Sequence, residues 1–383
     1  MNFDFDAPVE RAGTDSLKWG KYPAEVLPLW VADMDFAAPP AVVDALHGRV
    51  AHGVFGYNQP THGQVDAVVG YLARKFDWTI DPDWIVWLPG LVSGLNVACR
   101  AVGEADDAVF TATPIYPPFL SAPRYSGRRV VSVPLLRDST GWLWDFPAVD
   151  GVLRSSRAKL FLLCHPHNPT GRVWNEDELW QLALLAEKHQ LVVCSDEIHN
   201  GLVLSPYCGH RPFATLSPEI AARTITLMAP SKTFNIPGLG CAFAVIPDPG
   251  LRRGFTDAMR GIVPHVNSLG LVATEAALRS CDDWQAALLD YLRGNARAVE
   301  RAVGELPALD MRPIEATYLA WIDARDFAAG RGIGNPARWL EQQGLGLSDG
   351  ADFGAPGYVR LNFGTRRALL DEALARLERA MAS

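Results

Sequence analysis

Lys159-Leu-Phe-Leu-Leu-Cys164 is the stretch that decides the fold, because it is one of four short apolar runs that recur along the middle of the chain. Each run is too short for a typical helix and is apolar almost throughout, as strands buried on both faces of a parallel sheet are. The other three runs are Ala108-Val-Phe-Thr-Ala-Thr113, Leu191-Val-Val-Cys194 and Thr224-Ile-Thr-Leu-Met228. Helical patterns separate them, and this alternation predicts an α/β fold with a parallel sheet covered by helices on both faces.

A chemically distinct side chain follows each of the four predicted strands. These side chains are Tyr116, Asn168, Asp196 and Lys232. In an open α/β sheet the ligand lies outside the carboxyl ends of the strands, so an aromatic ring, an amide, a carboxylate and an amine are expected to meet there on one small molecule. This set of groups suits pyridoxal 5'-phosphate as a cofactor.

Lys232 is the predicted reactive amine, and only six lysines compete for that role (18, 21, 75, 159, 188 and 232). A partly desolvated lysine forms imines readily, whereas the alternative is a lysine that extends from a strand end into solvent. Asp196 ends a predicted buried strand, where a carboxylate is costly unless it meets a cation such as the protonated ring nitrogen of the cofactor. The alternative for Asp196 is a helix cap or a salt bridge in a loop.

Three further residues are predicted to contact the pyridine ring of the cofactor. Asn168 can donate its amide to the 3'-oxygen of the ring, although Asn-Pro alone is typical of an ordinary turn. Tyr116 is suited to stack on a pyridine ring, and core packing is its alternative. His199 is predicted to bond near the 3'-oxygen unless it is a satisfied core histidine, and Glu197 is interpreted as structural.

A phosphate and a carboxylate also need binding groups. The turn Pro89-Gly-Leu-Val-Ser-Gly94 joins a predicted strand to a helix, and free N–H groups at such a helix start can hold an anion, here at Gly90, Val92 and Ser93. Arg360 lies beside Asn362 in a predicted strand, and its guanidinium can bind a substrate carboxylate through two hydrogen bonds. The alternative for Arg360 is a salt bridge to the acidic last helix.

Composition limits the possible classes of protein. At 383 residues with 49% hydrophobic content, the chain can bury a large core in two or three domains. Its net charge of −8, without a basic stripe, argues against nucleic acid and anionic membranes as partners. No apolar stretch is long enough to span a bilayer, and the acidic start is unlike a signal peptide, so a cytoplasmic protein is predicted.

Cysteine and histidine usage predicts neither disulfides nor a metal site. The six cysteines (99, 164, 194, 208, 241 and 281) form no C-x-x-C pair and mostly lie in apolar runs, which indicates reduced, packed thiols. His165 and His167 have no carboxylate or cysteine at ligand spacing, so no metal is expected there.

The sequence pattern predicts an N-terminal arm and two domains. We predict an N-terminal arm over 1–40 that packs with the small domain, a large cofactor-binding domain over 41–275, and a small α+β domain over 276–383. Helices are expected to start at Pro39-Pro40 and after the capping box Asn175–Glu178. Further helices are expected over 61–74, 268–279, 284–306 and from 365, and a further strand over 317–322.

Together these motifs resemble the fold-type I pyridoxal-phosphate enzymes of aminotransferase class I/II, and within them the cystathionine β-lyase (C–S lyase) branch of MalY/PatB type. The resemblance covers nearly the whole chain. Two segments are specific to the branch, Trp30-Val-Ala-Asp-Met-Asp-Phe36 and Asp196-Glu-Ile-His199, whereas His167-Asn-Pro-Thr-Gly171 and Arg360-Leu-Asn362 are shared by the larger family. The fold implied is a mostly parallel seven-stranded sheet with a smaller α+β domain.

The resemblance also implies roles for single residues. Lys232 would be the Schiff-base lysine, Asp196 the pyridinium partner, and Arg360 the clamp on the substrate carboxylate, with backbone support from Ala32. Tyr57 would reach the phosphate of a neighbouring subunit, so the protein would be a homodimer with shared active sites. The remaining cofactor contacts implied are Gly90, Val92, Ser93, Tyr116, Asn168, His199 and Ser231.

Two positions depart from the larger family, with Ala229 where many members have serine and Gly240 where many transaminases have arginine. The activity implied is β-elimination from cystathionine or a related cysteine S-conjugate, giving a thiol, pyruvate and ammonia. The alternatives are an aminotransferase, a decarboxylating variant acting on a specialised amino acid or cysteine conjugate, and a regulatory binding role.

Overall fold

A seven-stranded sheet forms the centre of the large domain in the computed structural model, which describes residues 3–382. From one edge to the other the strands are β2 (Ile85–Leu88), β10 (Ala242–Val245), β9 (Thr224–Met228), β8 (Val192–Asp196), β7 (Ala158–Cys164), β3 (Ala108–Thr113) and β4 (Arg129–Pro134). Only β10 runs antiparallel to its neighbours within this sheet. The prediction of a mostly parallel seven-stranded sheet is therefore confirmed.

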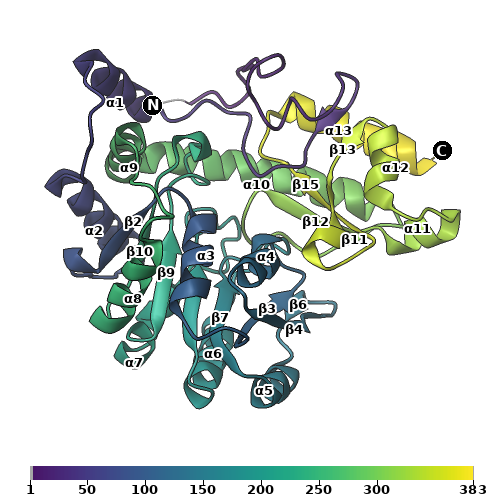
Figure 1. The fold of residues 1–383 in the computed structure, drawn as a ribbon. Helices are drawn as coiled ribbons and strands as arrows, with labels where there is room; N and C mark the ends of the chain where they lie inside the picture. The colour runs from purple at the N-terminus through teal and green to yellow at the C-terminus, as the bar shows by residue number, and fades with distance from the viewer. Residues whose placement is uncertain (1–2, 383) are drawn as a thin grey trace.

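Helices cover both faces of this sheet (Figure 1). Successive side chains of β7 show why its sequence is apolar: Phe161 and Leu163 join one buried cluster, and Leu160 and Leu162 join another. The helices of the large domain are α1 (Pro40–His52), α2 (His62–Phe76), α3 (Leu91–Ala101), α4 (Pro118–Tyr125), α5 (Phe146–Ser155), α6 (Glu176–Lys188), α7 (Pro218–Ala221), α8 (Pro249–Met259) and α9 (Ser268–Ser280).

The C-terminal part of the chain builds a second, antiparallel sheet. Its strands lie in the order β11 (Asp310–Met311), β12 (Leu319–Asp323), β15 (Tyr358–Asn362) and β14 (Ser348–Asp349). The helices around it are α10 (Asp282–Gly304), α11 (Arg325–Arg331), α12 (Pro336–Gln342) and α13 (Arg367–Ala382). A short hairpin of β5 (Leu136–Arg137) and β6 (Trp142–Leu143) extends from the large domain toward this sheet (Figure 1).

The N-terminal segment crosses from the large domain to the C-terminal sheet. Figure 1 shows it in purple, running from α1 to the yellow elements near the C-terminus. Its strand β1 (Leu27–Pro28) pairs in parallel with β13 (Leu345–Gly346). The rings of Phe5 and Phe36 pack on Tyr291 of α10. The exact limits of the arm and of the two domains stay predictions.

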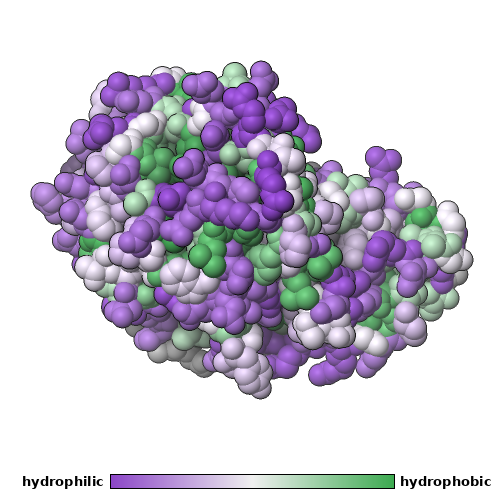
Figure 2. Space-filling view, turned by 90° about the horizontal axis from the view of Figure 1, so that it is seen from below, coloured by the Kyte–Doolittle hydropathy of each residue, from purple (hydrophilic) through white to green (hydrophobic). Residues whose placement is uncertain are grey.

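Most predicted elements occur within two residues of their expected ends, including the capping box at Asn175. One difference has a clear physical reason. The predicted strand over 317–322 starts only at Leu319, because Thr317 has a φ of 74°, in the left-handed region that a strand cannot contain. Seen from below, the molecule presents mostly hydrophilic side chains with scattered apolar patches (Figure 2). No helix within residues 3–382 is both long and apolar enough to cross a membrane.

Candidate active site

A cavity of about 700 Å³ lies at the carboxyl ends of β3, β7, β8 and β9. The N-terminal arm and the small domain supply its other walls. Every predicted site residue except Tyr57 lines this cavity, namely Ala32, Gly90, Val92, Ser93, Tyr116, Asn168, Asp196, His199, Ser231, Lys232 and Arg360. Residues from positions 32 to 360 therefore meet at one place, as expected for the carboxyl edge of an open sheet.

Lys232 follows β9 and is enclosed by protein. Its Nζ donates a hydrogen bond of 2.5 Å to the backbone oxygen of Ala32 in the arm. Burial, and to a lesser extent the nearby Arg360 guanidinium, lower the pKa of the Lys232 amine to about 8 against the opposing effect of Asp33 and Asp196. A larger fraction of this amine is therefore uncharged near neutral pH than for an ordinary lysine, which suits a nucleophile and a base.

Asp196 is the last residue of β8, and its side chain is buried. One of its oxygens accepts a hydrogen bond of 3.1 Å from the amide of Ile198. Burial raises the pKa of the carboxyl to about 7, and within residues 3–382 no cation lies at ion-pairing distance from it. The predicted alternative of a loop salt bridge is therefore wrong. A buried carboxylate without an ionic partner in the described chain fits a cation that binds in the cavity.

Arg360 has the complementary feature, a buried cation without a carboxylate partner in the described part of the chain. The predicted alternative, a salt bridge to the last helix, is wrong, because the guanidinium instead donates to backbone and neutral side-chain oxygens. These are Asn168 Oδ1 at 3.0 Å, the Trp30 carbonyl at 2.9 Å and Ser348 Oγ at 3.2 Å. Its Nε has no partner among residues 3–382. Burial lowers the pKa of Arg360 to about 10, so it stays charged at neutral pH.

The bond from Arg360 also orients Asn168. Because the amide oxygen of Asn168 accepts this bond, its NH₂ group is left without a protein partner within the described residues, at the wall of the cavity. This is the orientation that donation to a ring oxygen requires. His199 likewise has a buried Nδ1 without a partner, and burial lowers the pKa of its imidazole to about 3, so the ring is neutral.

The start of α3 forms the predicted anion cradle. Its N-cap is Gly90, which carries no capping side chain, so the first N–H groups of the helix, including those of Val92 and Ser93, have no intrahelical partner. Ser231 reaches the same cavity from the turn after β9. Gly240, where arginine is common in transaminases, adopts a φ of 55°, a left-handed conformation that a longer side chain would strain.

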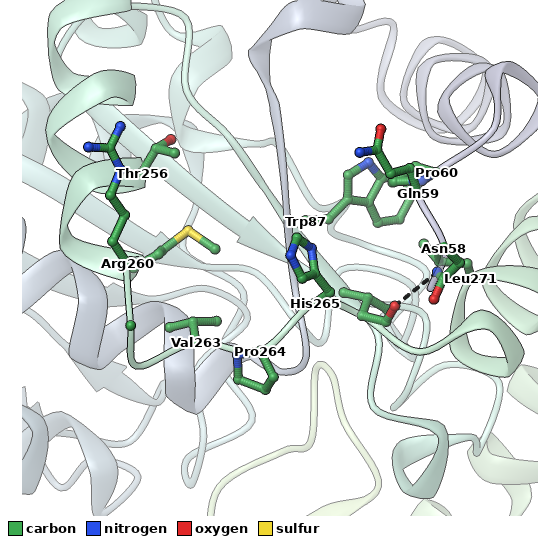
Figure 3. Close-up of a pocket in the computed structure, with 13 residues that line it drawn as sticks. Asn58, Gln59, Pro60, Trp87, Thr256, Arg260, Val263, Pro264, His265 and Leu271 are labelled. Carbon is green, nitrogen blue, oxygen red and sulfur yellow. Dashed lines mark hydrogen bonds between the residues drawn. The ribbon is translucent and has the colours of Figure 1, made fainter. Parts of the chain in front are cut away.

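Tyr57 is outside this cavity. It lies in the segment between α1 and α2, and it is fully exposed, with Val54 and Phe55 also about 60% exposed. Asn58, next to it, donates a hydrogen bond of 3.1 Å to the backbone of Val266 and lines a separate pocket of about 450 Å³. Figure 3 shows this pocket, with Trp87 and His265 at its centre. Within one chain, then, Tyr57 does not reach the phosphate cradle.

One wall of the cavity went unnoticed in the sequence. It consists of arm and small-domain side chains, among them Lys21, Trp30, Ser348 and Phe353. Lys21 Nζ lies 4.1 Å from the centre of the Trp30 ring, and the Arg360 guanidinium lies 4.7 Å from the centre of the Phe353 ring. In the arm, the segment Trp30–Phe36 could have indicated this wall from the sequence. Residues 338–353 of the small domain contain no comparable motif.

The chemistry of the side chains decides which cofactor or metal the site can hold. Within residues 3–382 no group of three or more His, Cys, Asp or Glu side chains is arranged to hold a metal ion. His167 Nδ1 lies 2.8 Å from Thr170 Oγ1, and His165 Nε2 lies 3.2 Å from the Arg211 carbonyl oxygen. A free amine, an unpaired carboxylate, an anion cradle and an aromatic ring instead fit pyridoxal 5'-phosphate.

Comparisons with known proteins agree with this fit. Residues 24–377 match the model of the aminotransferase class I and II family. The chain is 36% identical to cystathionine beta-lyase PatB of Bacillus subtilis, over 99% of this chain and 100% of PatB. The crystal structure of OvoB superimposes with a TM-score of 0.96 at 47% identity, and each chain is covered completely.

A structure with bound cofactor is also similar. The PLP-bound C–S lyase of Staphylococcus hominis has a TM-score of 0.95 at 29% identity, with 100% of this chain and 99% of the other covered. The predicted resemblance and cofactor are therefore confirmed. The chain belongs to the aminotransferase class I and II family of pyridoxal-phosphate enzymes, in the branch that includes PatB.

Proposed function

We propose that this protein is a pyridoxal-phosphate-dependent C–S β-lyase that cleaves cystathionine or a related cysteine S-conjugate to a thiol, pyruvate and ammonia. One observation carries the amino-acid chemistry: a buried amine, Lys232, lies within electrostatic reach of both an unpaired carboxylate, Asp196, and an unpaired guanidinium, Arg360. The choice of C–S cleavage is supported by the similarity to PatB and to the C–S lyase of S. hominis over nearly full lengths.

Each group has a distinct task in this proposal. Bound pyridoxal phosphate supplies an electron sink for the electron pair left on the substrate Cα when its proton leaves. Asp196 holds the ring nitrogen protonated, and Tyr116 stacks on the ring. Arg360 and the backbone of Ala32 bind the substrate carboxylate, which fixes the Cα beside Lys232.

Lys232 moves the proton. As an uncharged amine it takes the proton from the Cα, and its lowered pKa makes this form available near neutral pH. The Cβ–S bond then breaks, the sulfur leaves with the bonding electron pair, and protonation gives the thiol. The remaining unsaturated amino acid takes up water and gives pyruvate and ammonia.

The phosphate contacts follow from the cradle. The N–H groups at the start of α3, with the hydroxyls of Ser93 and Ser231, would bind the phosphate. Asn168 and His199 would bind the 3'-oxygen. We further propose a homodimer in which Tyr57 completes the phosphate site of the partner subunit, supported by its full exposure in a segment that carries other exposed apolar side chains. All six cysteines are free thiols, which supports our proposal that the protein resides in the reducing cytoplasm.

Turnover without a keto acid tests the reaction type. With cystathionine or an S-alkyl cysteine alone, we expect many turnovers and equal amounts of thiol, pyruvate and ammonia, because elimination regenerates the starting cofactor. A barrier about 1.4 kcal/mol lower for elimination than for transamination already gives a tenfold preference. Product quantification against enzyme concentration measures this. An aminotransferase would stop after one turnover and resume only when a keto acid is added.

Subunit mixing tests the shared site. We expect Tyr57→Phe and Lys232→Ala homodimers each to be impaired, and a mixture of the two to regain activity, because one site of each heterodimer then contains both native residues. Activity is measured before and after subunit exchange, and exchange is verified with two differently tagged chains. Complete exchange without any recovery would contradict a contact across the interface.

A further inference from the structure

The arm makes a tight three-residue turn directly against Lys232. The amide of Asp33 donates to the carbonyl oxygen of Val31 at 3.0 Å, which closes a γ-turn with Ala32 at its centre. Such a turn points the carbonyl of its central residue outward, and the Ala32 carbonyl accepts the Lys232 amine. The N–H of Ala32 has no partner within residues 3–382, and Ala32 lines the cavity.

Asn362 holds this turn from one side. Its Nδ2 donates to the carbonyl oxygens of Val31 and Asp33, both at 2.6 Å, and its Oδ1 accepts the amide of Gly364 at 2.8 Å. The side chain is completely buried at the end of β15. Because the two outer carbonyls of the turn are bound to one amide group, the central peptide has little freedom to rotate.

Tyr318 holds the turn from the other side. Its hydroxyl donates to the Ala32 carbonyl oxygen at 3.0 Å, so this oxygen receives both Tyr318 and Lys232. The Tyr318 side chain is 1% exposed and is not part of the cavity wall, so it has no route to the substrate. Its ring packs edge-on against His199, with 6.5 Å between the ring centres.

We propose that Tyr318 and Asn362 are positioning residues for Lys232: they fix the Ala32 carbonyl as the acceptor that receives the lysine amine and holds it beside the substrate Cα. The inference rests on the proposed function, in which Lys232 moves the Cα proton. A proton transfer depends steeply on the placement of the base, and a misplacement of about 1 Å can cost about a hundredfold in rate. Removing either support should therefore slow this step by more than it weakens the binding of the substrate carboxylate, which Arg360 also holds.

Exchange of the α-proton tests the inference independently of C–S cleavage. L-alanine has no β leaving group, so with the holoenzyme in D₂O only proton transfer at its Cα is observed, by loss of the α-proton NMR signal. We expect Tyr318→Phe to lower the exchange rate at saturating alanine by about tenfold or more, with a much smaller change in the half-saturating concentration. Asn362→Ser should also lower the exchange rate, since it releases the carbonyls of Val31 and Asp33 that flank the Ala32 carbonyl.

Tyr71→Phe is the matched control, because Tyr71 is also a buried tyrosine whose hydroxyl makes one hydrogen bond, 3.0 Å to Asn200, away from the turn. It should exchange alanine within twofold of the wild type. Cofactor absorbance and thermal melting show which variants are folded and loaded, and Asn362→Ser decides if Tyr318→Phe does not fold. Wild-type exchange in a folded, loaded variant of either residue would overturn the inference. Failure to cleave thioethers with alanine exchange intact would contradict only the lyase proposal, whereas a wild type that exchanges no alanine would overturn both.

Discussion

Replacing Lys232 with alanine should reduce C–S cleavage by at least about a thousandfold, because one change removes both the amine that binds the cofactor and the base that moves the Cα proton. Lys232→Arg keeps a positive charge at this position but should be equally impaired, since a guanidinium neither forms the covalent bond nor gives up its proton near neutral pH. Thiol release from a cysteine thioether measures both variants.

Lys188→Ala is the control, because Lys188 lies on the surface and pairs with Asp150 at 2.7 Å. It should keep wild-type activity. Borohydride reduction of the holoenzyme, followed by peptide mapping, should place the cofactor on the peptide that contains Lys232. A label on Lys75, Lys159 or Lys188, or a Lys232→Ala variant with more than about a tenth of the wild-type rate, would contradict the assignment.

The part of the site on the sheet could be predicted because a general rule places it. Parallel strands open their carboxyl ends on one edge, so residues that directly follow buried strands must meet there whatever their distance in sequence. Tyr116, Asn168, Asp196 and Lys232 satisfy this rule. The apolar runs also predicted the sheet well, since strands that are buried on both faces consist almost entirely of apolar residues.

The arm and small-domain walls follow no such rule. The bond from Lys232 to Ala32 joins residues 200 positions apart, and the bond from Arg360 to Trp30 joins residues 330 apart. Neither hydropathy nor spacing encodes these pairings, which depend on how two domains and an arm pack together. The proposed role of Tyr318 could not be predicted for the same reason. The segment 317–322, in which it lies, predicts only a buried strand.

The absence of ion pairs at Asp196 and Arg360 excludes one alternative that the sequence left open, and it points to function. A salt bridge seemed a reasonable alternative for both Asp196 and Arg360, yet both are buried without an ionic partner in the described chain. Leaving such groups unpaired costs stability, so a fold that keeps one carboxylate and one guanidinium unpaired in the same cavity is arranged for a ligand that brings both opposite charges. An amino acid bound beside a protonated ring nitrogen meets that requirement.

Asp196→Asn should therefore lower kcat by about a hundredfold or more, because an amide cannot hold the ring nitrogen in its protonated form and the electron pair left on the Cα loses its sink. The absorbance spectrum of the bound cofactor should change as well. Glu197→Gln is the matched control: Glu197 is also buried, but its carboxylate is bound within the protein, by Ser195 at 2.8 Å, His210 at 2.8 Å and the Phe213 amide at 3.0 Å. It should lower the melting temperature while the folded enzyme keeps its rate and spectrum. An Asp196→Asn enzyme within tenfold of the wild type, or an equal loss in Glu197→Gln, would show that the carboxylate at the end of β8 serves the fold and not the cofactor.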